Sequence, residues 1–406
     1  MTLALTTPSA AQAPDPLAID EALDLALENQ PALDAYGRTA RASEEAAVAA
    51  RQLPDFEAVA GVRNLPVTGS NPLSFDAEMM TMRFVGIGRR QVRGAKRRAA
   101  SARLLAEAEV ARADEVLMAL RIERDVLLAW TDAVEAQERQ AVLESLAGRL
   151  EARVRTAEAN VPTGRASAAD AVAAQADVSA VRAEIAAARG AEASARAMLA
   201  RWIGDAVDRP LAGGLPICRL PGREIVRAAI DGHPQLELAR SRTAVAERSI
   251  DIARADRLPD WGWSIIYGNR GGGRSDMVSL QLSMDLPFNR SRLQDRRVAE
   301  AGELAAAARD RTEDMRRELT AGLEQALAEF DAAQMRLETT AEQTLPALRA
   351  AEQAQEARFE GGGGSLESVL IASERTVRAA LDLVEQRAAV ARASADLHYY
   401  SDECLP

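Results

Sequence analysis

The sequence predicts a mainly α-helical protein with a small β part, and three observations support this class. The chain has 406 residues, of which 48% are hydrophobic and only 3% aromatic, a balance that favours thin Ala/Leu helical seams over one thick globular core. Long tracts carry apolar residues at three- and four-residue steps, whereas short segments alternate with period two. The same order of segments also occurs twice along the chain.

The repeat is marked by paired motifs. Leu53-Pro54-Asp55-Phe56 returns as Leu258-Pro259-Asp260-Trp261, and Gln30-Pro31 with Leu33 returns as His233-Pro234 with Leu236. We expect a first repeat over residues 17–203, an inter-repeat linker over 204–222 and a second repeat over 223–406. Residues 1–16 are expected to be a leader remnant or disordered, because a small-residue motif is present without a positively charged start.

Alternating segments predict a pair of strands in each repeat. The first pair is expected at about 55–65 and 77–88, and the second at about 260–269 and 277–288. In the second pair the apolar Val278, Leu280 and Leu282 alternate with serine and glutamine. In the first pair we expect Phe56, Ala58, Ala60 and Val62 to form the apolar face of one strand. Met80, Met82 and Phe84 are expected to form the apolar face of its partner. Strands of about 9 to 11 residues cross a bilayer when tilted.

Four strands are too few to close a membrane sheet. Open edges in lipid would leave backbone groups unpaired at several kcal/mol each, so further copies of the chain are needed for closure. No run of about 18 apolar residues predicts a transmembrane helix. Two soluble hairpins packed on helices remain the alternative.

Each strand pair precedes a very long helix, expected from about Gln91 to Asn160 and from Asn289 to Glu360. Roughly 70 residues span about 105 Å at the α-helical rise. Pro346 removes one hydrogen bond within the second helix and predicts a bend. Both helices end at glycine-containing tips, at about 160–167 and 359–365, and return helices follow.

Composition excludes several chemistries. The net charge of −11 argues against a nucleic-acid surface. With 2 His and 2 Cys, the chain has no cluster with metal-ligand spacing, so we expect no bound metal. The Gly271–Gly273 run lacks the following lysine and serine or threonine of a phosphate loop, so no cofactor is expected.

The ordered motifs resemble the TolC-like outer-membrane efflux family over about Leu17 to Tyr400. They are the repeat, the Leu-Pro-Asp start of each strand pair, Leu345-Pro346, and Phe359 followed by Gly362, Ser365 and Val369-Leu370. Three further segments resemble the heavy-metal efflux branch typified by CzcC, namely 64–66, 76–82 and 93–97.

The resemblance implies a homotrimer whose twelve strands close one outer-membrane β-barrel, continuous with an antiparallel coiled-coil α-barrel across the periplasm. Such a protein is not an enzyme. It is an exit duct that receives substrate from a periplasmic adaptor (membrane fusion) protein and an inner-membrane pump, here of the RND type. Heavy-metal cations are the expected cargo, with drugs or other small organic molecules as the alternative. A periplasmic adaptor and a soluble coiled-coil scaffold remain rival functions.

The resemblance also assigns roles to residues near the tips. Asp170, Glu367 and Glu374, with Arg165, are expected to form the periplasmic aperture or gate, although acids at a helix start also stabilise the helix itself. The expected adaptor contacts are Gly164, Ser167, Gly362, Gly364 and Ser365.

The two cysteines are expected to meet. In the implied architecture Cys218 of the linker and Cys404 at the carboxyl end both lie near the middle of the tunnel, in an oxidising compartment, so we predict a disulfide that ties down the tail.

Overall fold

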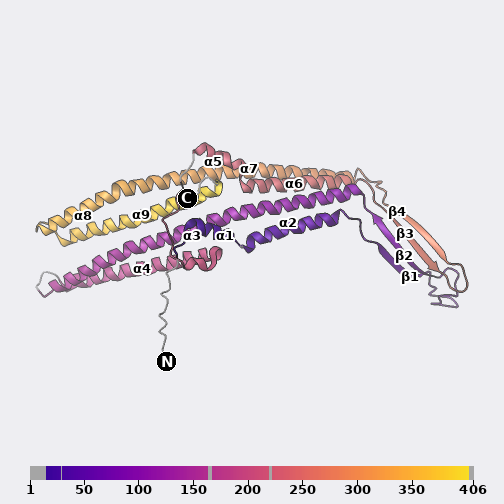
Figure 1. Cartoon of the computed structure of the whole chain (residues 1–406), viewed down its shortest axis with the longest axis horizontal. Helices are drawn as coiled ribbons and strands as arrows, with labels where there is room; N and C mark the ends of the chain where they lie inside the picture. Colours follow the sequence, from indigo (N-terminus) through magenta and orange to yellow (C-terminus); the bar gives the residue numbers. More distant parts are fainter. Residues whose placement is uncertain (1–14, 29, 163–166, 219–221, 402–406) are drawn as a thin grey trace, which may run out of the picture. The chain divides into compact units, whose positions relative to one another are not determined.

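The computed structural model describes residues 15–28, 30–162, 167–218 and 222–401 (Figure 1). The chain divides into two compact units, each built from both sequence repeats. The helical unit takes Met1–Asp34, Leu117–His233 and Arg316–Pro406, and the sheet unit takes Ala35–Val116 and Pro234–Met315. The two compact units therefore do not coincide with the two sequence repeats.

Most of the described chain is helical. The α-helices are α1 (Ile19–Leu27), α2 (Pro31–Ala50), α3 (Gly94–Asn160), α4 (Ala168–Ile203), α5 (Arg223–Ala229), α6 (Pro234–Ala255), α7 (Gln294–Thr339), α8 (Leu345–Glu360) and α9 (Leu366–Tyr400). Two short 3₁₀ segments are η1 (Gly204–Asp208) and η2 (Ile230–Gly232). In the described part of the chain, no helix has the length and apolar character needed to span a membrane.

Pro346 marks an interruption, as expected, but its form is a π-helical turn. The turn η3 covers Thr340–Thr344, and α8 then begins at Leu345 with the proline in its first positions. A proline there lacks only an N–H that the start of a helix leaves unpaired. The wider turn therefore moves the break in the hydrogen-bond ladder to just before the proline.

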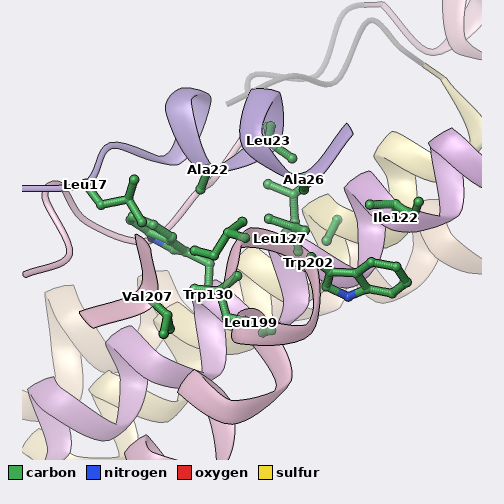
Figure 2. Packing of buried hydrophobic residues seen from close by; sticks show 14 of the residues in the cluster. Leu17, Ala22, Leu23, Ala26, Ile122, Leu127, Trp130, Leu199, Trp202 and Val207 are labelled. Atoms are coloured by element: carbon green, nitrogen blue, oxygen red, sulfur yellow. The ribbon is translucent and has the colours of Figure 1, made fainter. Parts of the chain in front are cut away.

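The core of the helical unit is a cluster around Trp130, which is fully buried (Figure 2). Leu17 and the buried face of α1 pack on Trp130 of α3 and on Leu199 and Trp202 of α4. Leu17 also bonds to the chain after η1, since its N–H donates to the Pro210 carbonyl at 2.8 Å. The α1 segment therefore covers the α3–α4 pair on one side.

The sheet unit carries one antiparallel sheet of four strands in the order β1-β2-β3-β4. The strands are β1 (Glu57–Arg63), β2 (Met82–Gln91), β3 (Trp261–Asn269) and β4 (Met277–Met284). Strands β2 and β3 come from different sequence repeats, so their pairing joins the two repeats within one chain. Within this sheet β1 and β4 are the edges, each paired on one side.

Two strand limits differ from the alternation pattern. The second strand, expected at 77–88, occupies Met82–Gln91. In the preceding loop, Leu73 has φ 58° and its N–H donates to the Pro66 carbonyl. This compact turn keeps the backbone before Met82 out of the hydrogen-bond ladder between strands. The fourth strand ends at Met284 rather than near residue 288, since Pro287 has no N–H to donate.

Candidate functional site

The strand register sorts the sheet into two unlike faces. Ala58 lies opposite Ile87, Ile87 opposite Ile265, and Ile265 opposite Leu280, so one apolar row crosses all four strands. The side chains on this face are Ala58, Ala60, Val62, Val85, Ile87, Trp261, Trp263, Ile265, Tyr267, Val278, Leu280, Leu282 and Met284, with Arg83 and Arg89 near its ends.

This apolar face is exposed. Val278, Leu280 and Leu282 are 69–71% exposed, and Val85 is 57% exposed. A contiguous apolar surface of this kind marks a surface that binds a partner or contacts a membrane. Aromatic rings gather where the face meets the helices: the Phe56 ring lies 6.2 Å from that of Trp263, and the Arg89 guanidinium lies 4.6 Å from the Phe56 ring. Such rings suit a membrane–water boundary.

The opposite face carries mostly glycine and polar side chains, together with Val59, Met82, Phe84, Ile266 and Met277, and it corrects one prediction. Met82 and Phe84 do not share a face with Ala58, Ala60 and Val62, because the register places them on the side of Arg63 and Ser264. The Phe84 ring lies over Gly61, where an added Cβ would be only 3.2 Å away, and Arg63 stacks on that ring at 4.9 Å. Glycines on neighbouring strands thus make room for these side chains. The true apolar partners on β2 are Val85 and Ile87.

A charged cluster fixes the point where the β2–β3 pair meets the helices. Asp260, just before β3, has a buried side chain that accepts from the Arg93 N–H at 3.1 Å, Lys96 Nζ at 3.2 Å and Arg90 at 3.3 Å. Burial by itself would raise the pKa of Asp260, but the hydrogen bonds from Arg93 and Lys96 outweigh it and hold the pKa below its ordinary value. Lys96 also pairs with Asp256 at 3.3 Å. The sequence flagged Asp260 only as a repeat marker, and its role in this cluster was missed.

The first helix-hairpin tip lies between α3 and α4. Arg165 and Gly164 lie outside the described residues, as does the side chain of Asp170 in α4. Ser167 is exposed and directly precedes α4.

The second tip is described almost completely. The Gly362 N–H donates to the Phe359 carbonyl and the Gly363 N–H to the Arg358 carbonyl, both at 3.0 Å, with Gly362 at φ 75°. These two bonds form a Schellman motif, which ends α8 with a left-handed residue. Ser365 then caps α9, because its hydroxyl accepts from the Ser368 N–H at 3.2 Å. Gly364 packs tightly against the end of α8.

Of the predicted aperture acids, Glu374 is described with its side chain, and Glu367 is not. Glu374 is exposed and forms an ion pair with Arg378 one turn further along α9. It lines a cleft of about 860 Å³ between the two helical hairpins, with walls from α3, α4, α8 and α9.

The cleft is strongly charged, with seven acidic side chains and four arginines. Arg149 of α3 lies 3.9 Å from Glu352 of α8, across the cleft. Burial lowers the pKa of Arg153, and the nearby Asp177 offsets only part of that change. In the described residues, no group of three or more histidines, cysteines or acids is placed to hold a metal ion.

Cys218 is buried, at 5% exposure, and Cys404 lies outside the described residues. Their pairing stays a prediction.

Residues 225–400 match the family model described as outer membrane efflux protein. This match confirms the resemblance that the sequence motifs predict to the outer-membrane efflux family. Outer membrane efflux proteins are transport ducts rather than enzymes, in agreement with the expectation that the chain is not an enzyme. A search of curated protein sequences found no match.

Solved structures show the same fold over almost the whole chain. The outer membrane protein VceC of Vibrio cholerae is 18% identical with a TM-score of 0.74, covering 94% of this chain and 95% of its own. The CmeC outer membrane channel of Campylobacter jejuni is 13% identical with a TM-score of 0.77, covering 95% and 86%. CusC, described as forming a transmembrane channel, is 16% identical with a TM-score of 0.74, covering 94% and 91%.

Proposed function

We propose that the chain is one subunit of a homotrimeric outer-membrane exit duct, in which twelve strands from three copies close one β-barrel. The observation that carries this proposal is the four-stranded sheet with an exposed apolar face, an opposite face of mostly glycine and polar side chains, and two edges paired on one side. In lipid, unpaired edges are too costly to persist, and closure removes them. The polar, glycine-containing face then lines the water-filled lumen.

The long helical hairpins extend the duct into the periplasm. Their tips would meet a periplasmic adaptor protein, which couples the duct to an inner-membrane pump of the RND type. Gly362, Gly364 and Ser365, with Gly164 and Ser167 at the other tip, are the proposed contacts. The capped turn at Gly362 supports this role, because it presents a short, ordered loop between two helices.

Near the tips, Asp170, Glu367 and Glu374, with Arg165, are the proposed aperture residues. The excess of acids over arginines in the adjoining cleft supports passage of cations, because a wall of one sign raises the local concentration of the opposite sign.

Heavy-metal cations are the proposed cargo, and drugs or other small organic molecules are the second candidate. The segments 64–66, 76–82 and 93–97, which resemble the heavy-metal branch, favour the first. Deletion of the gene followed by growth on a panel of metals and organic toxicants tests the choice. Sensitivity restricted to metals supports the first cargo, and sensitivity to dyes and detergents alone overturns it.

Fractionation tests the duct itself. A heat-modifiable trimer in detergent extracts of the outer membrane is expected. A soluble, elongated dimer would instead support a coiled-coil scaffold, and a protein held at the inner membrane would support an adaptor.

We also propose a disulfide between Cys218 and Cys404. Peptide mapping after alkylation of the non-reduced protein should recover one linked pair. Two freely alkylated thiols would overturn it.

A further inference from the structure

Two aspartates occupy equivalent places in the two repeats, but only one of them has cation partners in the described residues. Asp260, at the start of β3, is held by groups that follow β2. Asp55 occupies the same place at the start of β1, in the same Leu-Pro-Asp motif. Asp55 is exposed and, in the described part of the chain, has no hydrogen-bond or ion-pair partner. The strand that would supply one is missing, because β1 is an edge.

The Leu-Pro-Asp motifs place the strands of the two hairpins in equivalent positions. Glu57 of β1 pairs with Gly88 of β2, and Gly262 of β3 pairs with Ser283 of β4. Asn64, directly after β1, and Asn269, the last residue of β3, lie at the same distance from the Leu-Pro-Asp motif. The paired strands of β3–β4 can therefore be matched to those of β1–β2, and the pairing register of β2–β3 can be transferred by this match.

We propose that β4 of one copy pairs antiparallel with β1 of a second copy in the register of the β2–β3 seam. This inference rests on the proposed trimeric duct and specifies its subunit contact. The transferred register places Val59 opposite Ser283, Ala60 opposite Leu282 and Val62 opposite Leu280 of the neighbouring copy. In the chain itself, β1 and β4 are three strand spacings apart, about 14 Å.

The face pattern agrees with this register and excludes shifts by an odd number of residues. Ala60 and Val62 belong to the apolar face, as do Leu282 and Leu280, so the apolar belt continues without a break from copy to copy. A slip of one residue would turn every side chain of one strand to the opposite face. Just outside the paired window Glu57 would face Asp285, and Arg90, 3.9 Å from Asp285, supplies the compensating charge.

A second equivalence, counted from the helix starts, supplies a partner for Asp55. It differs from the strand equivalence by five residues, because α7 begins 11 residues after Ser283 whereas α3 begins 6 residues after Gly88. Lys96 is the third residue of α3, and Arg296 is the third residue of α7. The equivalence continues along the helices, since the buried Trp130 and Phe330 keep the same spacing from those starts. Arg296 is exposed, without an ion-pair partner in the described residues. We therefore assign Arg296 of the neighbouring copy to Asp55, as Lys96 is assigned to Asp260.

Cysteine cross-linking tests the register. The variant Val59→Cys/Ser283→Cys places the two thiols on directly opposite residues, within the Cα separation that a disulfide accepts. The matched control Val59→Cys/Leu282→Cys shifts the pairing by one residue and puts the thiols on opposite faces. The single variants control for the native cysteines. Mild oxidation of purified trimer should give covalent dimers and trimers from the first pair at about tenfold the control yield, a difference of about 1.4 kcal/mol.

The outcomes separate this inference from the proposed function. A trimer in detergent that cross-links through the control pair, or through neither pair, overturns the register and leaves the duct intact. A monomer that never forms a trimer overturns both.

A charge exchange tests the assigned ion pair. Asp55→Arg should lower the temperature at which the trimer dissociates in detergent, because two cations would then face each other at each of the seams. Adding Arg296→Asp should restore it. The control Arg311→Asp, an exposed position further along α7, should not restore it. Equal recovery with both second changes would overturn the pairing.

Discussion

The helical unit and the sheet unit use apolar side chains in opposite ways. In the helical unit, the largest ones are hidden: Trp130 is 0% exposed and Trp202 is 6% exposed, under the cover of α1. In the sheet unit, Trp261 is 41% exposed and Leu280 is 69% exposed, with polar groups turned to the other face. This difference agrees with the proposed duct, in which the helical unit is surrounded by water and the exposed apolar face of the sheet contacts lipid.

The largest effect is expected in the buried core. Trp130→Ala should cost about 3–5 kcal/mol, because it removes a large side chain and leaves a cavity among α1, α3 and α4. Chemical denaturation followed by circular dichroism in detergent measures this. Leu282→Ala, on the exposed face, is the matched control and should change stability far less. Equal losses would contradict the contrast between the units.

A charge placed on the exposed apolar face tests whether that face contacts lipid. Leu280→Arg should lower the stability of the folded protein in the membrane by about 2–4 kcal/mol, because the cation would enter lipid. The neighbouring Gln281→Arg points to the polar face and should be tolerated. The amount of folded protein in the outer-membrane fraction distinguishes the two. If both variants accumulate equally, the apolar face does not contact lipid.

The junction of sheet and helices should give an intermediate effect. Asp260→Asn should cost about 1–3 kcal/mol at neutral pH, because Lys96 and the Arg93 N–H lose an ionised acceptor. The folded-state pKa of Asp260 is depressed, so its stabilisation is present above the unfolded value of about 3.9 and is lost as the pH falls through the lower folded value. Unfolding midpoints measured from pH 7 to pH 2 check this. Asp256→Asn, a more exposed partner of Lys96, is the control and should lose less.

The smallest effect is expected at the second tip. Gly362→Ala should cost about 1 kcal/mol, because a Cβ is unfavourable at φ 75°. Gly363→Ala, next in the chain and without a positive φ, should cost less. Hydrogen exchange of α8 and α9 measures the local loss. Similar exchange in both variants would argue against the Schellman turn at this tip.

Local patterns in the sequence carried much of the fold. The alternation of Val278, Leu280 and Leu282 with polar residues is a property of one strand, so it identifies the strand and its apolar face without knowledge of its neighbours. The face of Met82 and Phe84 could not be predicted in this way. It depends on which residue of β1 lies opposite, and the compact turn around Leu73 shifts that register.

The site was less predictable than the fold. Asp260 stands out only when Arg90, Arg93 and Lys96 are brought to it from the other repeat, a contact between residues far apart in the chain. The Leu-Pro-Asp repeat was the available signal, although it marks Asp55 equally and only Asp260 has cation partners in the described residues. The cleft near Glu374 likewise needs four helices to meet.

The most direct test of the lipid-facing sheet uses the chain's own tryptophans, of which there are four. Trp261 and Trp263 lie on the exposed apolar face, whereas Trp130 and Trp202 are buried in the helical unit. Protein reconstituted in vesicles of brominated phospholipid should show strong fluorescence quenching, and the variant Trp261→Phe/Trp263→Phe should lose it. Absence of quenching in the unmodified protein, or equal quenching in the variant, would contradict a sheet embedded in lipid.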